Sequence, residues 1–372
     1  RQDKLRGGVV YQDGQFDDSR LAVNVAQTCV EHGASVLNYF KVNNLIIEDK
    51  AIKGVSAKDM ETGEDYQFFG DAIINATGVF TDDILKMENP NARNMVKPSQ
   101  GVHLVFDKSF LPGEDAIMIP KTEDGRVLFA VPWHDKVIVG TTDTQLDEHS
   151  LEPSALEKEI EFILETFNNY LEKKVTRADV RSIYAGLRPL AAPKDGSEKS
   201  KEISRSHKIL VSETGLITIT GGKWTTFRRM AQDTVNKAIS LGKLPKKECK
   251  TADLKIHGAK ENPDLSNHLY IYGSDQPEIQ NLINEDSSLG EKLHPRLDFL
   301  KAEVVFAARH ELARTVDDVL ARRVRMLFMD AKAAIESAPE VAALLAKELE
   351  KDEAWKEKQV ADFKEIAKHY TI

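Results

Sequence analysis

The segment Gly221–Arg229 constrains the fold more than any other part of the sequence. Before it, residues 216–220 alternate between apolar and polar side chains, a pattern that is typical of a β-strand. After it, apolar residues recur at helical spacing over 227–239. Two glycines therefore lie where a strand ends and a helix begins. Glycine allows a sharp turn of the backbone and the close approach of another group.

This corner has suitable chemistry for a negatively charged group. Thr225 or Thr226 can cap the following helix, and the free amides of its first turn attract an anion or an electron-rich oxygen. Lys223 adds a positive charge beside them. A phosphate, a carboxylate or a reduced flavin ring would suit the corner. An ordinary strand–turn–helix connection with a solvated lysine has the same spacing and remains the alternative.

Length and charge bound the class of protein. The 372 residues are 41% hydrophobic, which is enough for about two domains, and the net charge of −9 argues against broad nucleic-acid binding. No apolar run approaches the length needed to cross a bilayer. Cys29 and Cys249 share no ligand spacing, so we expect a reducing compartment with buried or inert thiols. Arg314 replaces the second histidine of a zinc-protease motif that begins at His310, and no metal site is predicted.

One further segment combines a predicted strand with small residues and a glycine. Residues 72–75 form a continuous apolar run, predicted to be a strand buried on both faces, and lead into Ala76, Thr77 and Gly78. A strand that ends in small residues brings backbone close to a ligand, although tight packing explains it equally well.

The alternation over 102–106 places His103 on the strand face opposite Leu104 and Phe106. Arg188 is the single arginine of an apolar segment, 182–190. It needs a carboxylate, a carbonyl or an anionic ligand as partner, and a structural salt bridge is the competing interpretation.

The character of the chain changes after about Lys243, where a linker is predicted, and from Leu300 onward the pattern is helical. Ser337 with Glu340 is predicted to cap the last helix. Three arginines are predicted to lie on a solvated helix face, with contact to a partner or a membrane surface as the alternative. They are Arg322, Arg323 and Arg325.

Taken together, several segments resemble one family, the FAD-dependent glycerol-3-phosphate dehydrogenases and the related α-glycerophosphate oxidases. They follow the order and spacing of that family, and residues 304–328 are similar to its C-terminal helical domain. The segments are Tyr11–Leu21, Ile74–Gly78, Gly101–His103, Val139–Asp143, Tyr184–Leu190 and Gly221–Arg228.

The beginning of the chain departs from this family. The family starts with a Rossmann half that carries a glycine fingerprint and a flavin-proximal arginine, whereas no two glycines lie two residues apart here. The chain also begins without Met and without a signal peptide. We therefore expect it to correspond to the C-terminal two-thirds of such an enzyme and to hold FAD weakly by itself.

The resemblance implies an α/β fold, in which an α+β substrate sheet joins the remainder of a Rossmann-like FAD domain, followed by a C-terminal all-α domain. The expected boundaries are 1–245 for the FAD- and substrate-binding part and 246–372 for the helical part. The implied reaction is oxidation of sn-glycerol 3-phosphate to dihydroxyacetone phosphate, with hydride transfer from C2 to the flavin N5. Electrons would pass to quinone, or to O2 in an oxidase. The short connection between Pro189 and Gly221 favours the dehydrogenase.

The resemblance also implies the site residues. His103, Arg188 and Lys223 are expected to act in catalysis and substrate binding, with His103 as a candidate base and the other two binding phosphate or the C2 oxygen. Whether His103 or Arg188 lies nearest C2 stays open. The residues expected to bind FAD are Val42, Ala76, Thr77, Gly78, Gly222, Lys223, Trp224, Thr225 and Thr226.

Two other classes of function remain open at this point. One is a flavin enzyme for an amino acid or another hydroxy acid, and the other is a binding module without catalysis. A cytoplasmic location, peripheral attachment to the inner face of the cell membrane, and a homodimer are further expectations.

Overall fold

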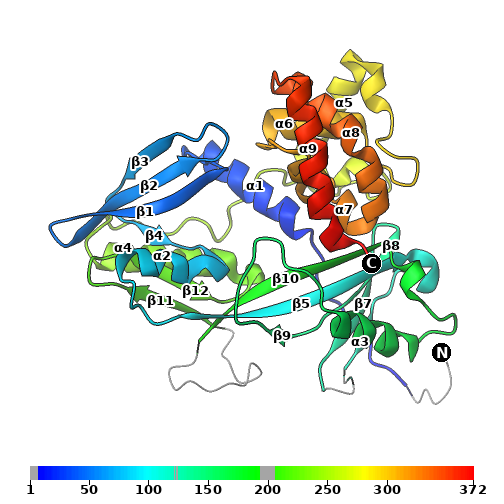
Figure 1. Cartoon of the computed structure of the whole chain (residues 1–372), viewed down its shortest axis with the longest axis horizontal. Coiled ribbons are helices and arrows are strands. Elements are labelled where there is room, and N and C mark those ends of the chain that lie inside the picture. Colours follow the sequence, from blue (N-terminus) through cyan, green and yellow to red (C-terminus); the bar gives the residue numbers. More distant parts are fainter. Residues whose placement is uncertain (1–6, 121, 123–124, 193–205) are drawn as a thin grey trace.

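The computed structural model describes residues 7–120, 122, 125–192 and 206–372. Residues 1–6 and 193–205 lie outside this part, and the second of these ranges belongs to the connection that favours a dehydrogenase over an oxidase. Figure 1 shows a central sheet with one helix beneath it and the C-terminal helices above it, while a small meander of three strands lies to one side.

The described strands form three sheets. One is an antiparallel meander in the order β1-β2-β3, and the second has the order β10-β5-β8-β7-β6 with β9 beside β5. The third has the order β11-β12-β4, in which β12 and β4 run parallel. The strands are β1 (Phe40–Glu48), β2 (Ala51–Asp59), β3 (Asp65–Phe69), β4 (Ile74–Asn75), β5 (Val96–Asp107), β6 (Ile117–Ile119), β7 (Leu128–Trp133), β8 (Lys136–Gly140), β9 (Thr144–Gln145), β10 (Ser182–Ala191), β11 (His207–Val211) and β12 (Ile217–Gly221).

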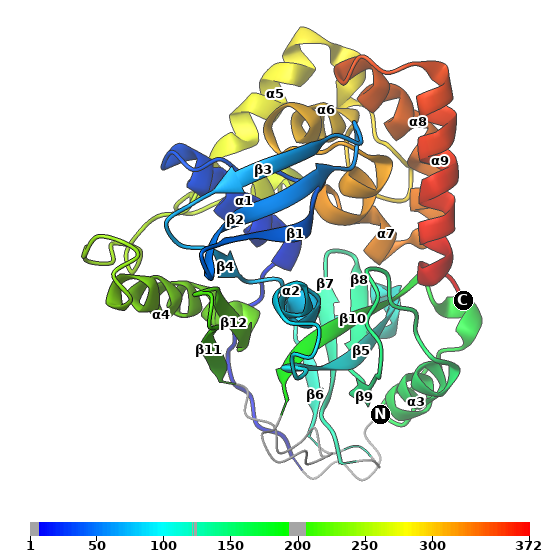
Figure 2. The ribbon, with the colours of Figure 1, turned by 60° about the vertical axis from the view of Figure 1, so that its left-hand side comes forward.

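The α-helices divide between the two halves of the chain, and five of those described follow residue 275. Figure 2 shows these five gathered on one side of the molecule, with α1 reaching toward them from the other half. The helices are α1 (Asp18–Glu31), α2 (Thr81–Glu88), α3 (Glu157–Asn168), α4 (Phe227–Ser240), α5 (Gln276–Glu285), α6 (Lys301–His310), α7 (Met326–Met329), α8 (Ala331–Glu348) and α9 (Glu353–Ala367). Asp17 caps α1 by accepting a hydrogen bond from the amide of Arg20.

The six-stranded sheet has an apolar face and an open face. Val102, Leu104 and Phe106 on β5 are fully buried and pack with α3, as do the matching residues of the neighbouring strands. His103 points to the other face, as the alternation over 102–106 predicts. The period of two thus places the hydrophobic core and the candidate polar residues on opposite sides of one strand.

A buried ion pair joins α1 to the C-terminal helices. The guanidinium of Arg20 contacts the carboxylate of Glu311, whose side chain is fully buried, and also lies over the ring of Tyr272. Desolvation lowers the pKa of Arg20, but the charges of Glu311 and Tyr272 outweigh it and raise the pKa of the guanidinium. The guanidinium is therefore charged in the folded chain, and its contact with Glu311 joins α1 to the C-terminal part of the chain.

Two expectations about local structure are wrong. The strand expected over 72–75 contains only Ile74–Asn75, and Ile74 is 39% exposed rather than buried on both faces. Ser337 does not begin a helix, because α8 starts after Asp330 and continues through Pro339, while Ser337 donates a hydrogen bond to the carbonyl of Leu293. The packing of this face therefore overrides the capping pattern.

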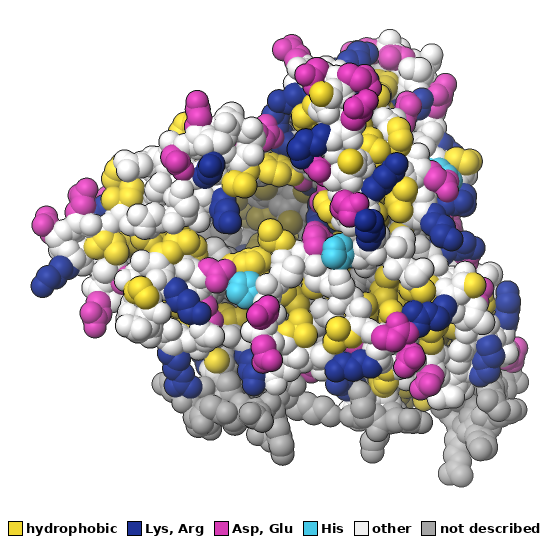
Figure 3. All heavy atoms as spheres, in the orientation of Figure 1, with side chains coloured by type: hydrophobic (Ala, Val, Ile, Leu, Met, Phe, Trp, Pro, Cys, Tyr) yellow, Lys and Arg dark blue, Asp and Glu magenta, His cyan; other side chains and the backbone are white. Residues whose placement is uncertain are grey.

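The two cysteines, Cys29 and Cys249, are exposed rather than buried. Across the described ranges, no helix is both long and apolar enough to cross a membrane. Figure 3 shows basic and acidic side chains interspersed on one face of the C-terminal helices. The domain boundary after residue 245 stays a prediction.

Candidate active site

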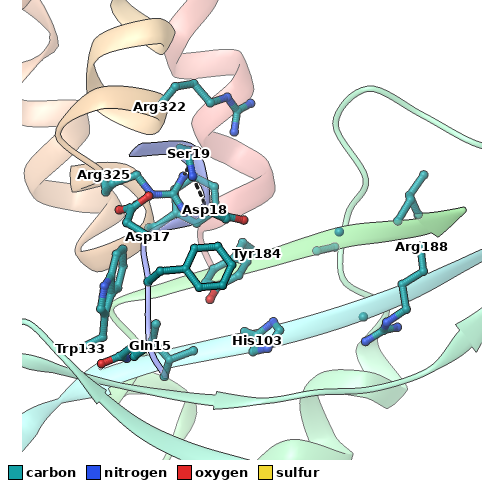
Figure 4. Close-up of a pocket in the computed structure, with 17 residues that line it drawn as sticks. Gln15, Asp17, Asp18, Ser19, His103, Trp133, Tyr184, Arg188, Arg322 and Arg325 are labelled. Carbon is teal, nitrogen blue, oxygen red and sulfur yellow. Dashed lines mark hydrogen bonds and ion pairs between the residues drawn. The ribbon is translucent and has the colours of Figure 1, made fainter. Parts of the chain in front are cut away.

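A pocket of about 550 Å³ lies between the open face of the six-stranded sheet and the C-terminal helices. Strands β5, β8 and β10 form its floor, and the segment 15–19 together with residues 322–328 forms the opposite wall. Figure 4 shows His103 and Arg188 on the strands of the floor, with Arg322 and Arg325 coming from the helices. Residues from three distant parts of the chain therefore meet here.

His103 lies flat on the floor of the pocket. Its ring stacks on that of Tyr184 at a centroid distance of 5.0 Å and an interplanar angle of 18°. In the sheet, its register partners are Tyr184 on β10 and Gly140 on β8. Burial, with a further contribution from the charge of Arg188, lowers the pKa of His103 to about 4. The imidazole is therefore neutral at physiological pH and can accept a proton.

Arg188 lies on the same floor and is held by the loop that follows β8. Its Nη2 donates a hydrogen bond of 3.1 Å to Oγ1 of Thr141, and its Nη1 lies 3.9 Å from Oδ1 of Asp143. Ser99 in turn donates a short hydrogen bond to Asp143. Arg188 thus has structural partners and also faces the pocket, so its role toward an anionic ligand stays a prediction.

Lys223 is not brought into this pocket. It lies exposed at the corner between β12 and the 3₁₀ helix Trp224–Thr226, and no residue of 221–226 lines the described pocket. His103 and Arg188 therefore meet in the described structure, whereas Lys223 belongs to the neighbouring edge.

The sequence prediction for Arg322, Arg323 and Arg325 is wrong, because these side chains do not form a solvated face. Arg325 is buried, and its Nη2 lies 3.1 Å from Oδ1 of Asp18. Its guanidinium also lies 4.0 Å from the ring centroid of Phe328.

The two neighbouring arginines have partners as well. Nη2 of Arg322 lies 2.8 Å from Oε1 of Glu152, and Arg323 donates a hydrogen bond of 2.6 Å to the carbonyl of Glu311. The sequence signal that could have revealed this is the apolar run on both sides of the arginines, at 319–321 and 326–329.

The glycine-rich edge beside the pocket is built from two parallel strands. Ile217 and Thr218 of β12 pair with Ile74 and Asn75 of β4. Because parallel strands end at the same edge of a sheet, residues 76–78 and 221–226 leave from that edge together. The structure thus brings together two of the segments that the sequence assigns to a cofactor.

The backbone of this edge is compatible with a bound anionic group. Gly78, Gly221 and Gly222 have φ values of 62°, 73° and 79°, a region that suits glycine. A side chain added at Gly222 would come within 2.6 Å of the sulfur of Met230. The positive φ therefore favours glycine at this turn.

The side chains around this turn are accessible. Ala76, Thr77 and all residues of 223–226 are exposed. A cofactor at this edge would therefore contact backbone and exposed side chains. Val42 is half-buried on β1, which belongs to the separate meander.

Fold and site together define a flavin-dependent oxidoreductase. The chain belongs to the FAD-dependent oxidoreductase family, whose model matches residues 1–228. Residues 212–356 match the C-terminal domain of alpha-glycerophosphate oxidase. FAD is the cofactor of this family, and the assignment of residues 76–78 and 222–226 to it stays a prediction.

Curated relatives narrow the likeness further. The chain is 39% identical to a mitochondrial glycerol-3-phosphate dehydrogenase of Arabidopsis thaliana, over 97% of the chain and 62% of the relative. It is 35% identical to the mitochondrial glycerol-3-phosphate dehydrogenase of Homo sapiens, over 97% of the chain and 53% of the relative. The chain therefore spans between half and two-thirds of the length of these relatives.

A solved structure agrees with this likeness. The glycerol-3-phosphate dehydrogenase from Bacillus halodurans, determined in complex with FAD, superimposes with a TM-score of 0.81 at 28% identity. The match covers 95% of the present chain and 73% of that structure.

Proposed function

We propose that the protein to which this chain belongs oxidises sn-glycerol 3-phosphate to dihydroxyacetone phosphate. The observation that carries the proposal is the meeting of His103 and Arg188 in one pocket, on strands that lead to the glycine-rich edge. The last residue of β10, Ala191, lies against Gly221, since a side chain added there would come within 3.5 Å of the Ala191 Cβ. The relatives named above are dehydrogenases of this substrate.

His103 is proposed as the base that takes the proton of the C2 hydroxyl. Its neutral imidazole is already in the form that accepts a proton. A dianionic substrate beside it would offset the charge of Arg188 and make the imidazole more basic. Binding of the correct substrate would therefore prepare the base.

Arg188 is proposed to bind the phosphate or to polarise the C2 oxygen, since its guanidinium offers a planar fork of donors. Lys223 is proposed to approach the same ligand from the glycine-rich edge. Such a role needs Lys223 to swing toward the pocket, and its exposure leaves it free of packing.

Bound FAD supplies the two-electron acceptor for this oxidation. Ala76, Thr77, Gly78 and Gly222 to Thr226 are proposed to hold it, with Val42 toward its adenosine end. Transfer of the electrons to quinone, or to O2, belongs to the same proposal. So do a cytoplasmic location with peripheral attachment to the cell membrane and a homodimer.

The test is an anaerobic titration of the flavin-loaded protein produced from the complete coding sequence. The flavin absorbance is recorded as glycerol 3-phosphate is added, with glycerol and D-amino acids as controls. Bleaching by glycerol 3-phosphate alone is the expected result. A yellow protein that does not bleach would retain the flavin fold but exclude this substrate, and a colourless protein would favour a binding module.

A further inference from the structure

The floor of the pocket contains three glycines whose positions are set by the sheet register. Gly101 precedes His103 by two residues on β5 and therefore shares its face. Gly186 pairs with Gly101 across the β10–β5 ladder, and Gly140 pairs with His103 across the β5–β8 ladder. Glycine is depleted in strands, and in a strand interior it often marks the close approach of another group.

Two of these glycines lie directly beneath the two polar groups of the site. A side chain added at Gly101 would come within 2.8 Å of Cζ of Arg188 and within 2.6 Å of Oγ1 of Thr141. A side chain added at Gly140 would come within 2.8 Å of Cγ of His103. Each polar group therefore occupies the space that a side chain would otherwise fill.

The third glycine leaves open space. A side chain added at Gly186 would meet nothing within 4 Å, although this residue also lines the pocket. In the register of β10, Gly186 lies between Tyr184, which stacks on His103, and Arg188. The floor between the two polar groups is thus bare backbone.

We propose that Gly101 and Gly140 are positioning residues, which form two slots in the sheet that hold the Arg188 guanidinium and the His103 imidazole flat on the floor of the pocket. This inference rests on the proposed function for its meaning in catalysis. The slots themselves are a property of the fold. They fix the depth and the separation of the two groups before a substrate enters, which is the preorganisation that efficient catalysis requires.

The two slots differ in what an added methyl group would displace. At Gly101 the obstructing atoms are the far end of Arg188 and a hydroxyl, so the guanidinium would move while the sheet stays intact. At Gly140 the obstructing atoms include the backbone carbonyl of Val102 at 2.8 Å. Gly101→Ala is therefore the cleaner test, and Gly140→Ala adds a second one.

The pKa of His103 depends on the position of the Arg188 guanidinium, and it can be measured in the absence of substrate. The charged and titratable groups around the imidazole are Tyr184 and Arg188 on β10 and Asp18 at the start of α1. Arg325 lies beyond Tyr184, with Phe328 between them. Displacement of Arg188 removes a positive charge, so the pKa of His103 should rise.

The experiment is a histidine NMR titration of the flavin-loaded protein, with the His103 signal assigned by its loss in His103→Gln. Gly101→Ala is expected to raise the pKa of His103 by about 1 unit, and to lower kcat/KM for glycerol 3-phosphate by at least about tenfold. Gly70→Ala is the control for a glycine-to-alanine change, because its added side chain would meet its nearest atoms at 3.6 Å, outside the pocket.

Gly186→Ala is the control within the pocket. It is expected to raise KM by projecting into the open space, without changing the pKa of His103. An equal pKa change in Gly186→Ala, or none in Gly101→Ala and Gly140→Ala, would overturn the inference. Loss of cooperative thermal unfolding in Gly101→Ala would overturn the inference as well. The added methyl group would then disrupt the sheet itself and would not simply displace the guanidinium.

Failure of the proposed function has a different signature. A wild-type flavin that glycerol 3-phosphate does not bleach would exclude this substrate, whereas a raised His103 pKa in Gly101→Ala would still support the slots. Conversely, an active wild type whose Gly101→Ala variant matches Gly70→Ala in both measurements would support the function and exclude the slots.

Discussion

The two faces of the six-stranded sheet are built from the same strands but carry side chains of different kinds. The face toward α3 carries Val102, Leu104 and Phe106, all fully buried in a hydrophobic core. The face toward the C-terminal helices carries Gly101 and His103, with an open pocket above them. A substitution on the face toward α3 should therefore change mainly the stability of the protein. A substitution on the face toward the pocket should change mainly its activity.

The largest effect on stability is expected at Phe106. Phe106→Ala removes a fully buried ring and should lower the free energy of unfolding by about 3–5 kcal/mol. Phe129 is the matched control, since it pairs with Gly140 on the open face and is 39% exposed. Urea unfolding of Phe129→Ala should show a loss below about 1 kcal/mol. Similar losses of unfolding free energy in the two variants would contradict the assignment of the hydrophobic core to the face toward α3.

The largest effect on activity is expected at His103. If it is the base, His103→Gln should lower kcat for glycerol 3-phosphate by about 10²- to 10⁴-fold with little change in stability. His149→Gln serves as control, because His149 lies at the surface beside Asp83, with 3.0 Å between its Nε2 and Oδ2 of Asp83. Steady-state kinetics with an unchanged kcat for His103→Gln would remove this residue from the mechanism.

The pH dependence of stability should report the same residue. The pKa of His103 is about 4 in the folded chain, below its ordinary value of 6.5, so the unfolded chain binds more protons between these two values. The contribution of His103 to stability is therefore complete above pH 6.5 and is lost as the pH falls toward 4. Denaturant unfolding across this range should show a shallower slope in His103→Gln, and an identical slope would contradict the described burial.

The smallest effect is expected at Thr141. Thr141→Val removes the hydroxyl that accepts the 3.1 Å hydrogen bond from Arg188. A hydrogen bond from a charged donor contributes about 1.5 kcal/mol or more, so KM should rise by about tenfold. Thr141→Ser retains the hydroxyl and should behave as wild type. A KM that rises in Thr141→Ser but not in Thr141→Val would show that packing of the methyl group, and not the hydrogen bond, holds Arg188.

Local patterns predict much of this fold. The alternation over 102–106 correctly separates His103 from the core residues. Local patterns fail where packing between elements decides the outcome. The capping pattern at Ser337 is overridden by a long helix packed on the core, and the run 72–75 forms only a two-residue strand.

The sequence by itself determined the class of protein and the identity of its polar groups, because motifs and periodicity are properties of neighbouring residues. The tertiary structure alone decided which groups share a pocket. The pair of Asp18 and Arg325 joins residues 307 positions apart, and no local pattern could assign Arg325 to the wall of the pocket. The slots beneath Arg188 and His103 depend on strand register, which pairs residues of β5 with glycine neighbours on β8 and β10. Contacts of this kind form only when the chain folds and brings distant segments together.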